Sequence, residues 1–215
     1  TLVQSGRVKV NGLIVREPSF AVEVGDDVMA DGQKVEAKQY VIVMLNKPAG
    51  YVTSKEDPHA EVTIMDLLPQ ELHHLVPVGR LDKESEGLLL LTNDGNLAHR
   101  LTHPKFHVDK TYTVRVGGEL AREKKMRLEH GVVIEGAKTA PCCIRDVQYN
   151  GTDTEFRMMI HEGRKRQIRL MLKAVGSHVH YLKRVAVGDL RLGDLKTGAW
   201  RYLNEREIAL LRRRS

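Results

Sequence analysis

The chain has 215 residues, enough for one sizeable core or for a small domain attached to a larger one. Hydrophobic residues make up 41% of the chain and charged residues 29%, which is typical of a globular protein and not of a disordered or fibrous one. Lysine and arginine outnumber aspartate and glutamate by 34 to 28. The resulting formal net charge of +6 favours a polyanionic partner such as a nucleic acid.

Several other classes of protein are disfavoured. No stretch approaches the roughly 20 apolar residues of a membrane span, and no secretory signal pattern opens the sequence. Cys142 and Cys143 are adjacent, which suits neither a disulfide framework nor a pair of metal ligands. His99, His103 and His107 are spaced like helical zinc ligands, but a proline interrupts that helix. We expect a reduced, cytoplasmic protein without a metal, a cofactor or a membrane contact.

Residues 1–38 are predicted to form a small module of short strands. Basic and apolar side chains alternate from Gly6 to Gly12, so that Arg7 and Lys9 share one side of the predicted strand. The run ends in Asn11-Gly12, a hairpin turn signal. The polar stretch 34–39 is expected to link this module to a second domain that covers residues 39–215.

Apolar runs predict the strands of this larger domain. Tyr40–Leu45 is short and continuous, as expected of a buried strand, and the turn residues Asn46–Gly50 follow it. Lys110–Val116 alternates cleanly, with Tyr112 on its apolar face. Further strands are expected over Leu75–Val78, Gly87–Leu91, Val132–Glu135, Cys143–Tyr149, Thr154–Ile160 and Val179–Val187.

Helical periodicity is clearest over Arg164–Val175. Its apolar residues recur at the spacing of one helix face, whereas its cations fall on another side. Thr63 is expected to cap a short helix over Ile64–Leu68, and Asn204 with Glu207 predicts a capping box for a closing helix. Two more helical segments are expected over Asn96–Leu101 and Glu119–His130.

Strands outnumber helices and mostly follow one another through turns. We therefore predict an α+β fold with a mixed, largely antiparallel sheet and packed helices. No glycine-rich nucleotide-binding string is present, so chemistry that needs a nucleotide cofactor is disfavoured.

The segment Gly79-Arg80-Leu81-Asp82 places an arginine and a carboxylate two residues apart between two apolar runs. An isolated Arg-x-Asp pair is most often a turn salt bridge. The longer string from Pro77 to Gly95, however, resembles the catalytic motif of the RsuA/RluB branch of the pseudouridine synthases. This resemblance implies that Asp82 is the nucleophile that attacks a uridine flipped out of its RNA.

Two further phrases resemble motifs of the same family. Gly163–Leu170 is similar to its Gly-Arg-x-x-Gln-Ile-Arg motif, which implies that Arg169 meets the catalytic aspartate. The phrase Lys110-Thr111-Tyr112 is similar to Lys-x-Tyr, which implies that the Tyr112 ring stacks on the flipped base. The residues alone leave two alternatives open: the cations could be a solvated helix face, and Tyr112 could be a core residue.

RNA contacts are implied for several basic residues. Arg80 is expected to fill the space that the extruded nucleotide leaves, although it could instead pair with Glu84 or Glu86. Lys47, in a family-like Asn-Lys-Pro-x-Gly turn, is expected to contact a phosphate. The module at 1–38 resembles the back half of an S4 RNA-binding domain. The other candidate RNA-binding residues are Arg7, Lys9, Arg164, Arg166 and Lys173.

The resemblance implies a monomeric ribosomal RNA pseudouridine synthase that needs no cofactor or metal, because the isomerisation imports no group and moves no net electrons. The strings 138–141 and 190–196 favour the branch that modifies large-subunit (23S) ribosomal RNA. Residues 44–48 also suit enzymes of the small-subunit (16S) RNA. The rival hypothesis is a non-catalytic RNA-binding protein of ribosome assembly. In either case the partner would be ribosomal RNA or an assembly intermediate.

Overall fold

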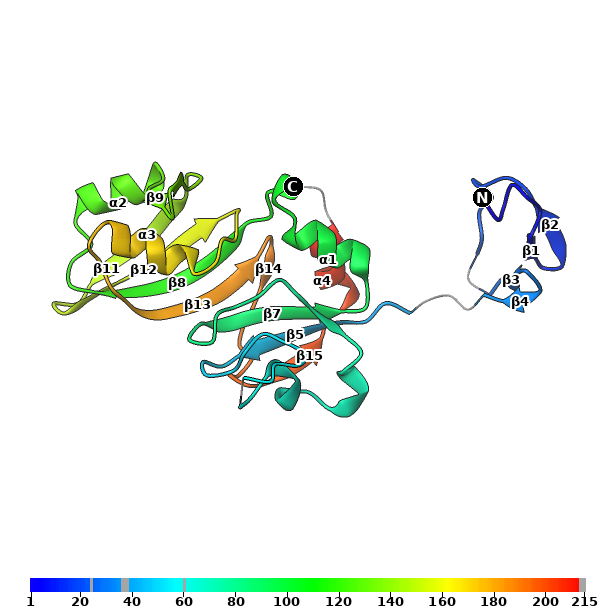
Figure 1. Ribbon diagram of the computed structural model, residues 1–215, viewed down its shortest axis with the longest axis horizontal. Coiled ribbons are helices and arrows are strands. Elements are labelled where there is room, and N and C mark those ends of the chain that lie inside the picture. The colour runs from blue at the N-terminus through cyan, green and yellow to red at the C-terminus, as the bar shows by residue number, and fades with distance from the viewer. Residues whose placement is uncertain (24, 36–38, 60, 213–215) are drawn as a thin grey trace. The chain divides into compact units, whose positions relative to one another are not determined.

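The computed structural model describes residues 1–23, 25–35, 39–59 and 61–212 (Figure 1). The chain divides into two compact units, Thr1–Gln39 and Tyr40–Ser215, and each unit is described here by itself. The expected linker over 34–39 includes residues 36–38, which lie outside the described residues. No helix of the described ranges is both long enough and apolar enough to cross a membrane.

The first unit is a small sheet with the strand order β2-β1-β3-β4. Asn11 and Gly12 have φ values of 50° and 81° and connect the first two strands, as the hairpin signal predicted. An Asp-Gly pair forms the corresponding turn between the last two strands. The strands are β1 (Val8–Val10), β2 (Leu13–Val15), β3 (Val28–Ala30) and β4 (Gln33–Lys34).

The second unit contains a larger sheet with the central order β11-β12-β8-β13-β7-β5-β15. Strand β6 pairs with β7 and β14 with β13. Every pairing between these strands is antiparallel except β13 with β7, so the predicted mixed, largely antiparallel sheet is confirmed. The strands are β5 (Ile42–Lys47), β6 (Val76–Val78), β7 (Glu86–Thr92), β8 (Lys110–Gly117), β11 (Cys143–Tyr149), β12 (Asp153–Ile160), β13 (Val179–Val187), β14 (Leu190–Arg191) and β15 (Trp200–Tyr202).

The predicted helices and their caps are present, with shifted starts. The Thr63 hydroxyl caps the 3-10 helix Ile64–Leu67, and Asn204 and Glu207 exchange two hydrogen bonds as the predicted capping box. The helix expected from Arg164 begins at Gln167, because Arg166 adopts a left-handed conformation with φ 52°. The α-helices are α1 (Gly95–Thr102), α2 (Arg122–Glu129), α3 (Gln167–Ala174) and α4 (Glu205–Arg212). The short elements are β9 (Val133–Ile134), β10 (Ala137–Lys138) and the 3-10 helices Gln70–Leu72 and Pro104–Phe106.

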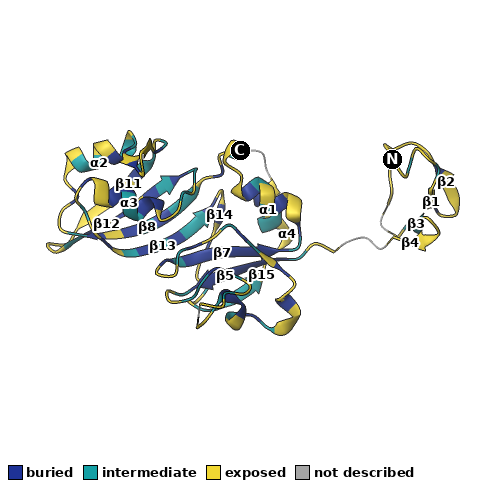
Figure 2. Cartoon of the chain, viewed as in Figure 1, coloured by how far each residue is buried: buried dark blue, intermediate teal, exposed yellow. Residues whose placement is uncertain are grey.

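The two faces of the sheet carry two hydrophobic cores. One core packs α2 and α3 over β8, β11, β12 and β13, and the other packs α1 and α4 over β5 and β7. Strands β5 and β7 contribute alternate side chains to both cores, which explains their continuous apolar sequences. Strands β8, β12 and β13 bury one face and leave the other partly open (Figure 2).

A close approach between β7 and β13 joins the two halves of the sheet. In this parallel pairing Arg184 lies opposite Gly87. Gly87 has φ 104°, and a Cβ atom at this position would lie 2.2 Å from the Arg184 carbonyl oxygen. Only a glycine allows the two main chains to come so close.

We expect Gly87→Ala to lower the free energy of unfolding by at least about 2 kcal/mol, because it adds a main-chain clash to an unfavourable φ. Gly95 is the matched control. It lies in α1 with no heavy atom within 4 Å of an added Cβ. Gly95→Ala should therefore be neutral or stabilising. Denaturant unfolding of the two variants checks this prediction, and equal effects would contradict it.

Candidate active site

The loop between β6 and β7 carries Arg80 and the half-buried Asp82. Thr53, which lies in another segment, holds this loop in place. Its hydroxyl donates to the Leu81 carbonyl oxygen at 2.7 Å and accepts from the Leu81 N–H at 3.2 Å. Within the loop, the Ser85 N–H donates to the Asp82 carbonyl oxygen at 3.0 Å. The main chain on both sides of the Asp82 side chain is therefore held by hydrogen bonds.

Lys47 supports the same loop from within the protein. Its side chain is fully buried, and its Nζ donates to the carbonyl oxygens of Ser85 at 2.9 Å, Pro48 at 3.0 Å and Asp82 at 3.2 Å. Burial lowers the pKa of Lys47 to about 8, against the opposing effect of nearby carboxylates, chiefly Asp82. The predicted phosphate contact of Lys47 is wrong, because its ammonium group faces main-chain oxygens inside the protein and not solvent.

A pocket of about 600 Å³ opens at this loop, and we call it the Asp82 pocket. Arg80 and Asp82 line it from the loop, Lys110 and Tyr112 from β8, and Arg184 from β13. Five of the predicted site residues, from three separate segments, thus line one cavity: Arg80, Asp82, Tyr112, Arg164 and Arg166.

Tyr112 is both a wall of this pocket and a member of the hydrophobic core. Its side chain is 8% exposed and belongs to the core under α3. In the sheet it lies opposite Arg184 of β13 and Met158 of β12. The core and pocket locations, which appeared to be alternatives in the sequence, therefore coincide in the structure.

Two cations, the buried Arg184 and the half-buried Lys110, form part of the pocket wall. The Arg184 Nε donates to the Leu88 carbonyl oxygen at 2.7 Å, and the Lys110 Nζ donates to the Val108 carbonyl oxygen at 2.9 Å. Burial, together with the charge of Arg184, lowers the pKa of Lys110 to about 8. No ion pair to a carboxylate is found for either side chain within the described ranges. Their charges are thus available to a ligand that brings negative charge.

The segment before α3 forms the opposite rim of the pocket. The Gln167 side chain accepts from the Arg164 N–H at 3.0 Å and donates to Glu162. The Arg164 guanidinium donates to the carbonyl oxygens of Ala137 and Lys138 and lies 3.5 Å from the Glu162 carboxylate. These contacts connect the rim to the β9–β10 hairpin.

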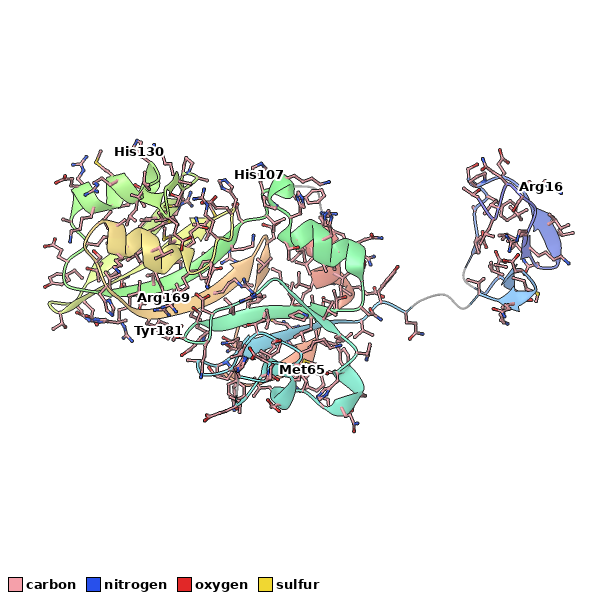
Figure 3. All side chains as sticks on the ribbon, in the orientation of Figure 1. Arg16, Met65, His107, His130, Arg169 and Tyr181 are labelled. Atoms are coloured by element: carbon pink, nitrogen blue, oxygen red, sulfur yellow. The ribbon has the colours of Figure 1, made fainter. Side chains whose placement is uncertain are left out.

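The predicted ion pair between Arg169 and Asp82 is not present in the part of the chain that the structure describes. The Arg169 Nη2 donates instead to the Glu84 carbonyl oxygen at 3.1 Å (Arg169 is labelled in Figure 3). The left-handed Arg166 delays the start of α3, and Arg166 itself lies 3.4 Å from the Glu84 carboxylate. Both arginines therefore meet the loop two residues after Asp82. The buried Nε of Arg169 has no hydrogen-bond partner among the described residues.

The other predicted residues lie apart from the pocket. Lys173 is exposed on α3 and does not line the pocket. In the first unit, Lys9 is exposed on β1, and Arg7 forms two hydrogen bonds with Asp31. The His99 and His103 rings are 4.9 Å apart. No group of three or more metal-ligating side chains that could hold an ion occurs among the described residues.

Sequence reasoning missed Thr53, Lys110 and Arg184 as parts of the site. Lys110 stands in the Lys-Thr-Tyr phrase, so its proximity to Tyr112 could have been noticed. Thr53 and Arg184 carry no local signal, because their roles depend on main-chain atoms of the distant residues Leu81 and Leu88.

Comparison with protein families agrees with this geometry. The family model described as RNA pseudouridylate synthase matches residues 40–174, which include Asp82 and Tyr112. The chain belongs to this family. Residues 1–28 of this RNA pseudouridylate synthase match the S4 domain.

Relatives and solved structures support the assignment along nearly the whole synthase. It is 38% identical to the ribosomal large subunit pseudouridine synthase B of Bacillus subtilis, over 98% of this chain and 87% of the relative. It is 37% identical to the ribosomal small subunit pseudouridine synthase A of Escherichia coli K12, over 96% of this chain and 90% of the relative. A crystal structure of a pseudouridylate synthase superposes with a TM-score of 0.75 at 32% identity, covering 98% of this chain and 90% of that one.

We expect Lys47→Met in this synthase to lower the free energy of unfolding by about 1–3 kcal/mol, because it leaves buried carbonyl oxygens without a donor. The salt dependence of RNA binding should stay unchanged, since Lys47 is buried. The exposed pocket residue Lys165 is the matched control. Lys165→Met should reduce the salt slope by about one and leave stability unchanged. Unfolding curves and RNA titrations at several salt concentrations test both variants. A reduced salt slope for Lys47→Met would contradict the role of Lys47 as a buried donor to main-chain carbonyl oxygens.

Proposed function

We propose that the protein converts uridine to pseudouridine at a specific position in ribosomal RNA, with Asp82 as the nucleophile. The observation that carries this proposal is the Asp82 pocket, which gathers Asp82, Arg80 and Tyr112 in a member of the pseudouridylate synthase family. A carboxylate on a loop held by hydrogen bonds can attack a flipped base without first reorganising its main chain.

The reaction needs no external reagent. The bond from the ribose C1′ to N1 breaks, the base turns, and a bond from C1′ to C5 forms; C5 loses a proton and N1 gains one. The Asp82 carboxylate forms a covalent bond to the uridine, at the ribose C1′ or at the base C6, and this bond breaks again as the product forms. The Tyr112 ring supports the turning base through stacking, which tolerates rotation better than fixed hydrogen bonds do. The reaction therefore requires the protein to supply a nucleophile, a cavity that excludes water and an aromatic ring on which the base can stack.

The basic residues around the pocket are proposed to hold the RNA. Arg80 fills the space left by the flipped nucleotide, while Arg164, Arg166 and Lys173 bind the phosphate chain. Arg169 is proposed to complete the site through its unpartnered Nε when the substrate is bound. In the first unit, Arg7 and Lys9 extend the positive surface, although Arg7 is already partly engaged by Asp31.

The proposed substrate is large-subunit (23S) ribosomal RNA, free or within an assembly intermediate, and the enzyme is proposed to act as a monomer in the cytoplasm. The strings 138–141 and 190–196 support this choice. The relatives include enzymes named for both subunits, at 38% and 37% identity. Unmodified transcripts of both ribosomal RNAs, assayed separately for pseudouridine, test the choice directly.

We expect Asp82→Asn to lower single-turnover pseudouridine formation by at least about a thousandfold, because an amide is a far poorer nucleophile than a carboxylate. RNA affinity and the free energy of unfolding should stay close to the parent values, since the amide keeps the size of the side chain. A variant that retained a substantial fraction of the parent rate would remove Asp82 from this role. A parent protein that bound ribosomal RNA without modifying it would favour the non-catalytic assembly protein.

Tyr112→Leu should lower the rate about 5- to 150-fold, the equivalent of the roughly 1–3 kcal/mol that stacking on one base contributes. Tyr112→Phe should retain most of the rate, because it keeps the ring. Single-turnover rates of the two variants at saturating enzyme make the comparison. Equal, severe losses would assign a proton-transfer role to the hydroxyl group, and parent rates for Tyr112→Leu would make Tyr112 a core residue alone.

A further inference from the structure

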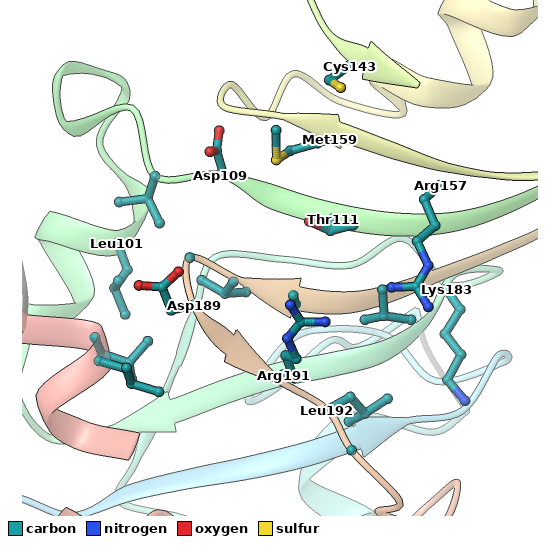
Figure 4. A pocket seen from close by; sticks show the side chains of 18 of the residues that line it. Leu101, Asp109, Thr111, Cys143, Arg157, Met159, Lys183, Asp189, Arg191 and Leu192 are labelled. Carbon is teal, nitrogen blue, oxygen red and sulfur yellow. The ribbon is translucent and has the colours of Figure 1, made fainter. Parts of the chain in front are cut away.

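A second pocket, of about 780 Å³, lies on the other face of the same sheet, and we call it the reverse-face pocket (Figure 4). The alternation of side chains along the strands separates the two. Lys110 and Tyr112 of β8 line the Asp82 pocket, whereas Thr111 between them lines the reverse-face pocket. On β13, Arg184 and Lys183 divide in the same way.

Three cations that line this pocket lie in one row across four neighbouring strands, with the neutral Thr113 between the second and the third. Arg145 of β11 lies opposite Arg157 of β12, Arg157 lies opposite Thr113 of β8, and Thr113 lies opposite Lys183 of β13. Residues that pair directly in antiparallel strands point to the same face. With about 4.8 Å between strands, the row from Arg145 to Lys183 spans roughly 14 Å. Arg191 of β14 adds a further cation to the pocket.

This row is only partly neutralised by the protein itself. Asp146 lies 3.5 Å from Arg157, and Arg145 donates to a cysteine sulfur. Lys183 and Arg191 take part in no ion pair or hydrogen bond of their side chains within the described residues. Like charges that face each other on neighbouring strands destabilise a sheet.

Two of the three acids that line the pocket, Asp109 and Asp189, are separated from the row, whereas Asp146 lies beside Arg157. Asp109 and Asp189 lie with Leu101 on the left of Figure 4, whereas Arg157 and Lys183 lie on the right, with Arg191 between the two groups. The pocket therefore has one end that attracts anions and one that does not. Leu101 and Val187 also line the Asp82 pocket, so the two pockets share part of a wall.

We propose that the row Arg145, Arg157 and Lys183, with Arg191, is a second RNA-binding site that holds phosphates of the substrate RNA outside the modified nucleotide. This inference rests on the proposed function. A row about 14 Å long can meet more than one phosphate of a strand, and the shared wall lets RNA that leaves the Asp82 pocket continue onto the reverse face. Asp109 and Asp189 repel phosphates from their end of the pocket, so the phosphates lie toward the end that holds the row.

The test compares RNA binding by the full chain and by Lys183→Gln combined with Arg191→Gln, using unmodified ribosomal RNA transcripts at several salt concentrations. Loss of two phosphate contacts should reduce the magnitude of the salt slope by about 1.4 to 1.8. The single-turnover rate at saturating enzyme should stay at the parent value, because neither residue lines the Asp82 pocket.

Two controls distinguish the effect of this site on RNA binding from the effect of the protein's net charge. Arg122→Gln with Arg127→Gln on α2 changes the net charge equally, but on the side of the sheet away from the row, and should reduce the slope less. Asp189→Asn removes a carboxylate from the pocket itself and should strengthen RNA binding. An unchanged slope for the Lys183 and Arg191 pair, an equal loss for the α2 pair, or weaker binding by Asp189→Asn would each overturn the proposal.

These outcomes are separable from failure of the proposed function. If the parent makes no pseudouridine in any ribosomal RNA but the row still governs RNA binding, the proposed function fails and the second site stands. If the parent modifies its RNA and the row has no effect on binding, the second site fails and the proposed function stands. A protein partner at this pocket would give the latter result.

Discussion

The main chains of β7 and β13 approach so closely at Gly87 that a Cβ atom would lie 2.2 Å from the Arg184 carbonyl oxygen, and the geometry of the Asp82 pocket depends on this contact. It is the parallel pairing of an otherwise antiparallel set of named strands. On one side stands the β7 half of the sheet, which carries the Asp82 loop. On the other stand β13 and β8, which carry Arg184 and Tyr112. A wider separation of the two halves would move the Asp82 carboxylate away from the Tyr112 ring.

Near this contact the protein places buried and half-buried cations against main-chain carbonyl oxygens. Lys47, Lys110 and Arg184 each donate to main-chain oxygens of nearby segments. A carbonyl oxygen orients a cation and leaves its positive charge in place. A carboxylate would orient the cation too, but it would neutralise the charge. The loop is thus fixed in place, while the surroundings of the pocket stay positive toward RNA. Burial of two lysines lowers their pKa values to about 8, so both remain mostly protonated at neutral pH.

The same strands serve two surfaces because their side chains alternate. The face under α2 and α3 contains one core and the Asp82 pocket, whereas the opposite face of β8, β12 and β13 is partly open and carries the reverse-face pocket. That open face carries the row Arg145, Arg157 and Lys183, of which Arg157 lies 3.5 Å from Asp146. In the proposed second site, an RNA substrate that reaches past the Asp82 pocket brings phosphates to Lys183 and Arg191, whose side chains have no ion-pair partner among the described residues.

The sequence by itself determined the elements whose signals are local. Continuous apolar runs predicted β5 and β7, alternation predicted β8, and turn and cap residues such as Asn11-Gly12 and Thr63 predicted the hairpin and the 3-10 helix. The family-like phrases indicated Asp82 and Tyr112, because motif residues keep their spacing along the chain. The three-residue strand β15 has no such signal, since it is too short for a period to be read.

Tertiary structure decided the roles that depend on contacts between distant segments. Lys47 follows an apolar run and resembles a surface lysine in the sequence. In the structure its buried ammonium group donates to the main-chain carbonyl oxygens of the distant residues Asp82 and Ser85. Arg169 sits on the predicted cationic side of its helix, but the left-handed Arg166 sets where that helix starts, and the guanidinium meets Glu84 instead of Asp82. The cationic row exists only through strand register. Register is set by bulges and by long-range pairing, whose free energies involve atoms far apart in the sequence and therefore leave no local pattern.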